Sequence, residues 1–574
     1  MKAPLLPGLT LLISLLFVST LSSQEDEITR IDALLTAYAS EDRLNGAVLI
    51  AQGDEVLYSK GFGLAHMELE VANTPDTRFR IGSITKQYTA ALILQLVEEG
   101  KVDLEGKLSD YVPDYPAEHG KQVTIHQLLN HTSGIVSYTG REEFWKKSRD
   151  PFTTQEFLEA FTVEELEFEP GTKWNYNNSG YYILGVVIEE VTGMPYDQAL
   201  RKRLMDPLGL ENTGYDHFHK VIKNRATGYL EWGIGYRRAG YIDTGLPYAA
   251  GMLYSTVGDM HKWTRALHAA KPFKNKETLE KMLTPYMQNY GYGIGINERT
   301  FGEETVQVIS HAGGVHGFAS NLVYFPEKEL TVAGADNTSS NIGVPMNGVI
   351  QIFHGQEAPA LKLNAYKELH TMIANEGMAP ALERFRDIRE NHMDAYRAGE
   401  RQLPRLAQSY LEEGLAELAQ PLLEENLKHF SESEETYVLL GHARLELGNK
   451  DQAIADFKKV LEINPGNKPA REKLEELGVV IEEKDVVVPP DLLSSYLGVY
   501  ELGPGFTLTL SLDEQQLLVT STGASPVEFF PKDNTNFYAK IVNAKFEINS
   551  DEAGVVTGMT YQQGGRTMNL PKIK

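Results

Sequence analysis

Cysteine is absent from the 574-residue chain, and its absence excludes several kinds of chemistry at once. Without thiols the protein forms no disulfide, no thiolate metal site and no thioester intermediate. Any enzymatic nucleophile must therefore be an oxygen or a nitrogen atom.

Positive charge is scarce as well, since 54 lysines and arginines stand against 79 aspartates and glutamates, leaving a formal net charge of -25. An acidic protein repels phosphate polymers, so we expect no nucleic-acid partner. Hydrophobic residues at 42% and charged residues at 23% exclude a disordered or multi-span membrane protein for most of the chain. At roughly 150 residues per domain, this length predicts about four folding units.

Only one segment is a long hydrophobic run, and it lies at the N-terminus. It extends over 13 residues, Leu9 to Leu21, follows Lys2 and precedes small polar residues. This order is typical of a signal peptide, and the run is short of the ~20 residues that a membrane-spanning helix needs. We expect residues 1–23 to be removed from an exported protein, periplasmic or secreted, with no stable membrane span afterwards. The alternative is an uncleaved anchor.

The first large segment mixes short strands with helices. Two apolar runs joined by Gly53-Asp54 predict a β-hairpin and therefore an antiparallel sheet. Residues 80–100 follow a helical pattern that is apolar on nearly every side after Ala90, which is typical of a buried helix. We interpret residues 28–356 as one α/β body.

Residues 360–478 have a purely helical pattern with a period of 34, visible in the pair Gly414 and Gly448. The second copy resembles the tetratricopeptide repeat at its small, aromatic and terminating positions, which are Tyr437, Leu440, Gly441, Ala453, Phe457 and Pro465. The repeats are expected to stack as helical hairpins, either recruiting a protein partner or serving as a spacer.

A charged and proline-rich linker separates the repeats from residues 486–574. There Leu508, Leu510 and Leu512 alternate with polar residues, which indicates a strand with one buried face. Because the strand and turn pattern recurs to the end of the chain, we predict a small antiparallel barrel or sandwich.

Ser83-Ile-Thr-Lys86 stands at the start of the predicted buried helix, so the lysine lies one turn after the serine on the same face. A serine becomes a good nucleophile when a base takes its proton, and a desolvated lysine of lowered pKa can be that base. The tetrapeptide alone is also compatible with an exposed helix start that has a capping serine.

Two further signals support catalysis. Tyr176-Asn177-Asn178 lies in a loop rich in glycine and asparagine, where a phenol could share a proton with Lys86 and Asn178 could bind a substrate carbonyl. His311-Ala-Gly313-Gly314 precedes a strand-like segment at 318–325, and its glycines would let a substrate backbone approach a strand edge. Each of the three short motifs occurs once.

With these motifs in this order, the sequence resembles the serine β-lactamase and penicillin-binding superfamily, in its class C-like branch of esterases, D-aminopeptidases and D,D-carboxypeptidases. The resemblance covers about residues 28–355. Its other motifs are Phe79-Arg-Ile-Gly82, Leu128-Leu-Asn-His-Thr-Ser-Gly134, Phe168-Glu-Pro-Gly171 and Ala249-Ala-Gly-Met-Leu-Tyr-Ser-Thr256 with Asp259. The C-terminal segment resembles the lipocalin-like domains appended to this branch.

The resemblance implies a role for each motif residue. Ser83 would be the acylated nucleophile, Lys86 and Tyr176 the proton-transfer pair, Asn178 and His311 to Gly313 substrate-binding groups, and the backbone N–H groups of Ser83 and Gly314 the oxyanion hole. His311 replaces the lysine of the usual Lys-Thr-Gly, and an ordinary histidine is mostly neutral at pH 7. The resemblance therefore favours esterases and peptidases over efficient antibiotic hydrolysis.

We therefore predict a β-lactamase-like catalytic domain, then tetratricopeptide-like hairpins, then a small β-barrel. The predicted function is that of an exported serine hydrolase acting through an acyl-enzyme on a small peptide, amide or ester. No metal and no cofactor are expected. The alternatives are a true β-lactamase, and a non-catalytic penicillin-binding or sensing protein that recruits a partner through the repeats.

Overall fold

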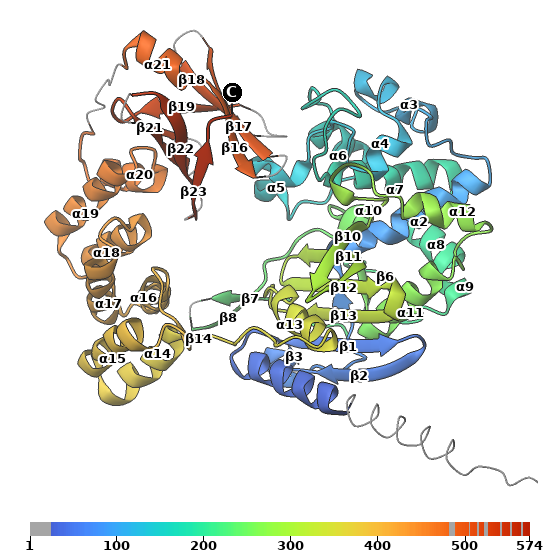
Figure 1. Ribbon diagram of the computed structural model, residues 1–574, viewed down its shortest axis with the longest axis horizontal. Helices are drawn as coiled ribbons and strands as arrows, with labels where there is room; N and C mark the ends of the chain where they lie inside the picture. The colour runs from blue at the N-terminus through green and yellow to red at the C-terminus, as the bar shows by residue number, and fades with distance from the viewer. Residues whose placement is uncertain are drawn as a thin grey trace, which may run out of the picture. The chain divides into compact units, whose positions relative to one another are not determined.

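The structure is a computed structural model (Figure 1), and it divides into two compact units. The first contains the described residues up to Glu231 together with Gly235–Leu361, and the second contains 232–234 and Lys362 onward. The predicted signal peptide and residues 482–487 of the predicted linker lie outside the described residues. The described residues are 25–232, 234–481, 488–503, 506–513, 516–521, 526–539, 542, 544–551, 554–563 and 566–573.

The first unit is built on a six-stranded antiparallel sheet in the order β10-β11-β12-β13-β1-β2. The predicted hairpin is confirmed, because β1 and β2 pair across the turn at Gly53-Asp54. Strand β1 also pairs with β13, so the two ends of this unit meet in the middle of the sheet. The strands are β1 (Gly46–Gln52), β2 (Glu55–Gly61), β10 (Gly295–Phe301), β11 (Glu304–Val315), β12 (Phe318–Phe325) and β13 (Leu330–Asp336).

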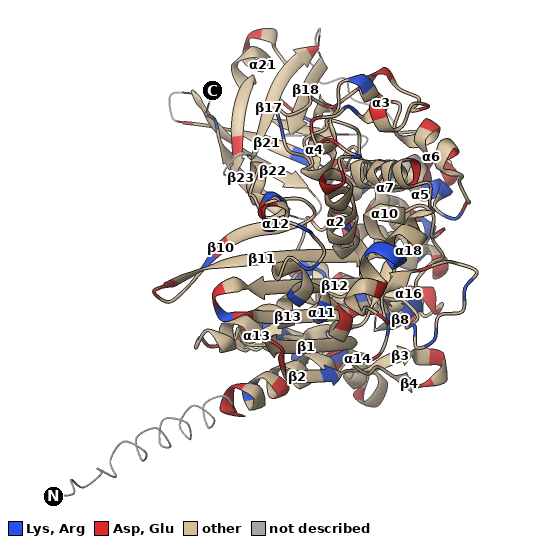
Figure 2. Ribbon diagram, turned by 90° about the vertical axis from the view of Figure 1, so that its right-hand side faces the viewer, with Lys and Arg blue, Asp and Glu red and all other residues tan. Residues whose placement is uncertain are grey.

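Helices cover both faces of this sheet, and the two faces bury alternate residues of β1. Leu49 belongs to the core that contains α2 (Thr85–Glu98), α7 (Asn178–Thr192) and α11 (Val257–His268). Val48 and Ile50 belong to a second core with α13 (Gly343–Phe353) and the helix of residues 25–40. A strand covered on both faces is mostly apolar, and β1 and β12 accordingly contain no charged residue (Figure 2).

The predicted start of the buried helix is wrong by five residues. Phe79–Arg80 form strand β5, which pairs with β9 (Leu253–Ser255), and the α-helix begins only at Thr85. Between them Gly82 has a φ of 50°, a left-handed conformation that interrupts a helix. Ser83 therefore lies in a short 3-10 turn, Gly82–Ile84, directly before α2.

The second unit begins with helical hairpins, and residues one period apart occupy equivalent places. Gly414 and Gly448 follow α16 and α18 with φ angles of 72° and 79°, as expected for glycines that end helices. Ala453 of α19 is fully buried, and Gly441 of α18 lies against the Phe457 ring. The helices are α14 (Ala365–Glu376), α15 (Met378–Asn391), α16 (Gln402–Glu412), α17 (Ala416–His429), α18 (Glu434–Glu446), α19 (Lys450–Ile463) and α20 (Lys468–Glu476).

An eight-stranded antiparallel sheet, preceded by α21 (Pro490–Tyr496), ends the second unit, with every strand beside its sequence neighbour. The first and last strands approach through an antiparallel bridge between Tyr500 and Lys572, so the barrel is nearly closed. Leu508 and Leu510 are buried inside it, as predicted. The strands are β16 (Gly498–Gly503), β17 (Phe506–Asp513), β18 (Gln516–Ser521), β19 (Val527–Pro531), β20 (Asn536–Ala539), β21 (Ala544–Ser550), β22 (Val556–Gln563) and β23 (Arg566–Pro571).

None of the helices in the described ranges is long and apolar enough to cross a membrane.

Gly441→Ala tests the packing of the repeats. The new Cβ would lie 2.6 Å from the buried Phe457 ring, which costs about 1–3 kcal/mol and outweighs the ~1 kcal/mol gained in helix propensity. We expect a lower unfolding midpoint for the second unit in a denaturant titration. Gly399→Ala is the matched control, because its Cβ would meet no atom within 4 Å. An unchanged midpoint in Gly441→Ala would contradict the packing described.

Candidate active site

Ser83 and Lys86, predicted to lie on one helical face, are in contact. The Lys86 Nζ atom is 3.1 Å from the Ser83 Oγ atom. It also lies 2.7 Å from Asn178 Oδ1 and 2.8 Å from the Ala250 carbonyl oxygen. The side chain of Lys86 thus joins the 3-10 turn that contains Ser83 (Gly82–Ile84, the serine turn) to the first residue of α7 and to α10 (Tyr248–Gly251).

Lys86 is completely buried, and no carboxylate in the described part of the chain is within ion-pair distance of it. Burial disfavours the ammonium form and lowers the pKa of Lys86 well below its ordinary value. Aromatic rings supply part of its surroundings, since Nζ lies 4.9 Å from the Tyr176 ring centroid and 5.5 Å from that of Tyr181. A lysine in such surroundings can exist as a neutral amine.

Tyr176 is the second predicted partner of Ser83. Burial raises the pKa of Tyr176 above its ordinary value, and a hydrogen bond with Ser83 opposes this rise in part. The phenol is therefore protonated at neutral pH. Ser83, Lys86 and Tyr176 are brought together although Tyr176 lies about ninety residues after the other two.

Asn178 lies where the sequence predicts it, but protein groups satisfy its side-chain amide. Its Oδ1 atom accepts from Lys86, and its Nδ2 atom donates to Thr139 Oγ1 at 2.9 Å. The preceding Asn177 caps α7, because its Oδ1 atom accepts from the Gly180 N–H at 2.8 Å. In this structure Asn178 thus orients Lys86, and a substrate carbonyl would have to share its amide.

His131 is a residue of this site to which the sequence reasoning gave no role. It is buried, has a left-handed φ of 64°, and its Nδ1 atom accepts from the backbone N–H of Asn177 at 3.1 Å. Its ring lies 4.5 Å from the Tyr176 ring, so it supports the loop that presents the tyrosine. The quoted motif from Leu128 to Gly134 contains His131, and that motif was the available signal.

His311 lies within β11 and is held in one neutral form. Its Nδ1 donates to the Ala312 carbonyl oxygen at 2.6 Å, so its Nε2 accepts from the Tyr290 hydroxyl at 2.9 Å. Burial lowers the pKa of His311 to about 4, and the neighbouring Lys86 adds to this effect. Tyr290, which no motif indicated, is thus a partner of the predicted substrate-binding histidine.

The glycines after His311 allow the strand to pack on the serine turn. A Cβ atom on Gly313 would lie 1.9 Å from the Ile81 carbonyl oxygen, which also accepts from Ser320 Oγ at 2.8 Å. Strand β10 pairs with β11 only as far as Ser310, so the following residues form a free edge among the described strands. Gly313 is therefore required for contact with Ile81, in addition to any approach of substrate.

A cavity of about 90 Å³ opens beside Ser83. Its described lining combines the predicted site residues with aromatic and aliphatic side chains. Among the lining residues are Ser83, Asn178, Gly314, Phe144, Trp145 and Ile242.

A buried serine–lysine–tyrosine cluster between an antiparallel sheet and a helical layer defines the serine hydrolases of the β-lactamase and penicillin-binding superfamily. Comparison with known proteins agrees, because the Beta-lactamase family pattern matches residues 31–346, more than half of the chain. The chain belongs to this family and is a serine hydrolase of that superfamily. The tetratricopeptide repeat pattern matches residues 434–467, which are the second copy of the predicted repeat.

Similar proteins include PbpX of Bacillus subtilis, named as a penicillin-binding protein, which is 30% identical over 278 residues, covering 48% of this chain and 68% of the relative. A teichoic acid D-alanine hydrolase of Staphylococcus aureus is 28% identical over 324 residues, covering 56% of this chain and 76% of that protein. The crystal structure of FmtA from Staphylococcus aureus superposes with a TM-score of 0.50 at 27% identity, covering 58% of this chain and 91% of that one.

Gly313→Ala tests the contact between strand and serine turn. A displacement of about 1 Å at reacting groups can slow a reaction ~100-fold, so we expect at least that loss in the rate of fluorophosphonate labelling. The melting temperature should fall as well. Gly314→Ala, whose Cβ meets nothing within 4 Å, should keep the wild-type melting temperature. Wild-type labelling and melting in Gly313→Ala would rule out the tight contact.

The neutral state of His311 leads us to predict that the stability of the protein depends on pH. The pKa of His311 is about 4 in the folded chain, against ~6.5 for an unfolded histidine, so the unfolded chain binds its proton first. The free energy of unfolding should therefore fall by about 3 kcal/mol as the pH drops from 6.5 to 4, at ~1.4 kcal/mol per pH unit. Nuclear magnetic resonance should give a titration midpoint near 4, and His311→Gln should remove this part of the pH dependence. A midpoint near 6.5 would contradict the buried neutral state.

Proposed function

We propose that the protein is an exported serine hydrolase that forms an acyl-enzyme on Ser83. The observation that carries the proposal is the set of acceptors around Lys86. Asn178 Oδ1 and the Ala250 carbonyl oxygen can only accept, so they take two N–H groups of the lysine. A neutral amine has two hydrogens and one lone pair, and the lone pair then faces Ser83 Oγ. Lys86 is thereby oriented as a base.

The proposed reaction begins when Ser83 Oγ attacks the carbonyl carbon of an ester or amide and its proton moves to Lys86. The negative charge that develops on the carbonyl oxygen is stabilised by the backbone N–H groups of Ser83 and Gly314. Tyr176, hydrogen-bonded to Ser83, passes a proton to the leaving group as the carbon–oxygen or carbon–nitrogen bond breaks. Water then attacks the ester on Ser83 and gives its proton to the Tyr176 phenolate, while the Ser83 oxygen leaves with the proton held by Lys86, so all three groups return to their starting states.

The proposed substrates are small esters, amides or peptides. Neutral His311 provides no cation for a β-lactam carboxylate, which favours these substrates over antibiotics. The small cavity beside Ser83, with Phe144, Trp145 and Ile242 in its wall, suits a compact acyl group. Similarity to a teichoic acid D-alanine hydrolase supports D-alanyl esters within this class. Turnover of D-alanyl esters, D-alanine anilide, a short-chain ester and a cephalosporin would rank them.

Export is proposed from the composition of residues 1–23, which has the order of a signal peptide. The proposed domain bounds are 28–356 for the hydrolase, 360–478 for the repeats and 486–574 for the barrel. The tetratricopeptide match at residues 434–467 supports a protein partner for the helical region.

Ser83→Ala and Tyr176→Phe test the covalent mechanism. Loss of the nucleophile should lower kcat/KM by several orders of magnitude, and loss of the phenol should cause a serious but smaller decrease. Mass spectrometry after incubation with a fluorophosphonate should show one adduct on Ser83 in the wild type and none in Ser83→Ala. Full labelling and turnover in Ser83→Ala would contradict the proposed acyl-enzyme on Ser83.

A further inference from the structure

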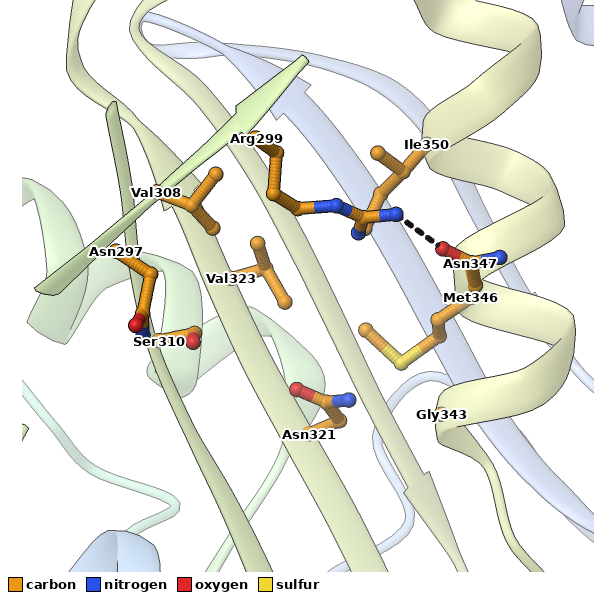
Figure 3. Close-up of a pocket in the computed structure, with 10 residues that line it drawn as sticks. All are labelled: Asn297, Arg299, Val308, Ser310, Asn321, Val323, Gly343, Met346, Asn347 and Ile350. Atoms are coloured by element: carbon orange, nitrogen blue, oxygen red, sulfur yellow. Dashed lines mark hydrogen bonds between the residues drawn. The ribbon is translucent and has the colours of Figure 1, made fainter. Parts of the chain in front are cut away.

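A second cavity, of about 390 Å³, lies in the first unit between α13 and strands β10, β11 and β12 (Figure 3). Side chains alternate across a strand, so the cavity faces the side of the sheet opposite the serine turn. Ser320 bonds to the Ile81 carbonyl in that turn, whereas its neighbour Asn321 lines this cavity. The volume is within the ~300–1,000 Å³ typical of small-molecule sites. The catalytic cluster uses none of the residues in its lining.

Arg299 of β10 is the one charged residue in the described lining. Its side chain reaches across the cavity toward α13, where Nη2 donates to Asn347 Oδ1 at 2.6 Å (Figure 3). No carboxylate in the described ranges is within ion-pair distance of this guanidinium. A half-buried arginine that is oriented by an amide keeps donors available for an anion, and planar guanidinium binds carboxylate in two-point geometry.

Three further polar side chains in the lining have unused hydrogen-bonding capacity. Asn297, Ser310 and Asn321 have no side-chain hydrogen bond to any described residue. Together they offer two amides and one hydroxyl, each able to donate and to accept. The α13 helix also begins at Gly343 in the lining, so its positive N-terminal end adds to the attraction of an anion.

The remaining lining is apolar and limits the ligand to a small, partly hydrophobic molecule. Val308 and Val323 on the strands and Met346 and Ile350 on α13 form this part (Figure 3). One guanidinium balances one negative charge, and a doubly charged phosphate would leave an uncompensated charge against these side chains. A single carboxylate on a short body with amide or hydroxyl groups matches the lining better.

We propose that this cavity is a second ligand site, which binds a small monocarboxylate with amide or hydroxyl groups through Arg299. The carboxylate pairs with the guanidinium, and the polar part of the ligand bonds to Asn297, Ser310 and Asn321. This proposal goes beyond the hydrolase function and does not depend on it.

Isothermal titration calorimetry on full-length Ser83→Ala protein provides the test without turnover. The probe is N-acetyl-D-alanine, and N-acetyl-D-alaninamide is its uncharged counterpart. A charge-assisted pair is lost in the amide, so the carboxylate should bind about tenfold tighter or more. Equal affinity for the two probes, or no heat with either at millimolar concentration, would overturn the proposal.

Variants locate the binding. Arg299→Gln removes the cation, and Asn347→Asp neutralises it with a carboxylate of similar size. Each should weaken carboxylate binding about tenfold or more, while the melting temperature confirms folding. Arg201→Gln, which removes an exposed arginine elsewhere in the first unit, should bind as the parent does. Unchanged binding in Arg299→Gln and Asn347→Asp would place the ligand elsewhere and refute the site.

Discussion

The desolvation of Lys86 is the constraint on which the catalytic unit depends. An ammonium group without a carboxylate is costly in a protein interior, and burial within helix α2 therefore lowers the pKa of this lysine well below its ordinary value. The cost of burying a positive charge applies equally to the two histidines near Lys86. Burial and the nearby Lys86 also lower the pKa values of His131 and His311, so the site holds neutral hydrogen-bonding groups. Polarity here comes from oriented lone pairs and N–H groups.

Patterns within neighbouring stretches of the sequence allowed much of the fold to be predicted. The hairpin at Gly53-Asp54, the buried helix and the 34-residue repeat each have a local signal, and the structure contains all three. The helix start was predicted wrongly because β5 pairs with β9, whose residues lie about 175 positions later in the chain. No local pattern reports such pairing, and the left-handed Gly82 lies between the paired strand and the start of α2.

In the candidate site, too, contacts between residues close in sequence could be predicted, and contacts that form only on folding could not. Ser83 and Lys86 were predictable as neighbours because one helical turn separates them. Tyr290 was not, since its hydroxyl reaches His311 only after the chain folds back through β10. The cavity around Arg299 had no sequence signal either, because its lining side chains, which come from three consecutive strands and one helix, face one another only once the sheet and α13 have packed.

The pairing of β1 with β13 has a consequence for how the chain acquires its structure. Asn45 and Asp336 bond across 291 positions, so the central strand pair forms only after nearly the whole first unit has been synthesised. Contacts of such long range make folding slow compared with that of helical hairpins. Until β13 has been synthesised, β1 can pair only with β2, and the six-stranded sheet that carries the serine turn stays incomplete.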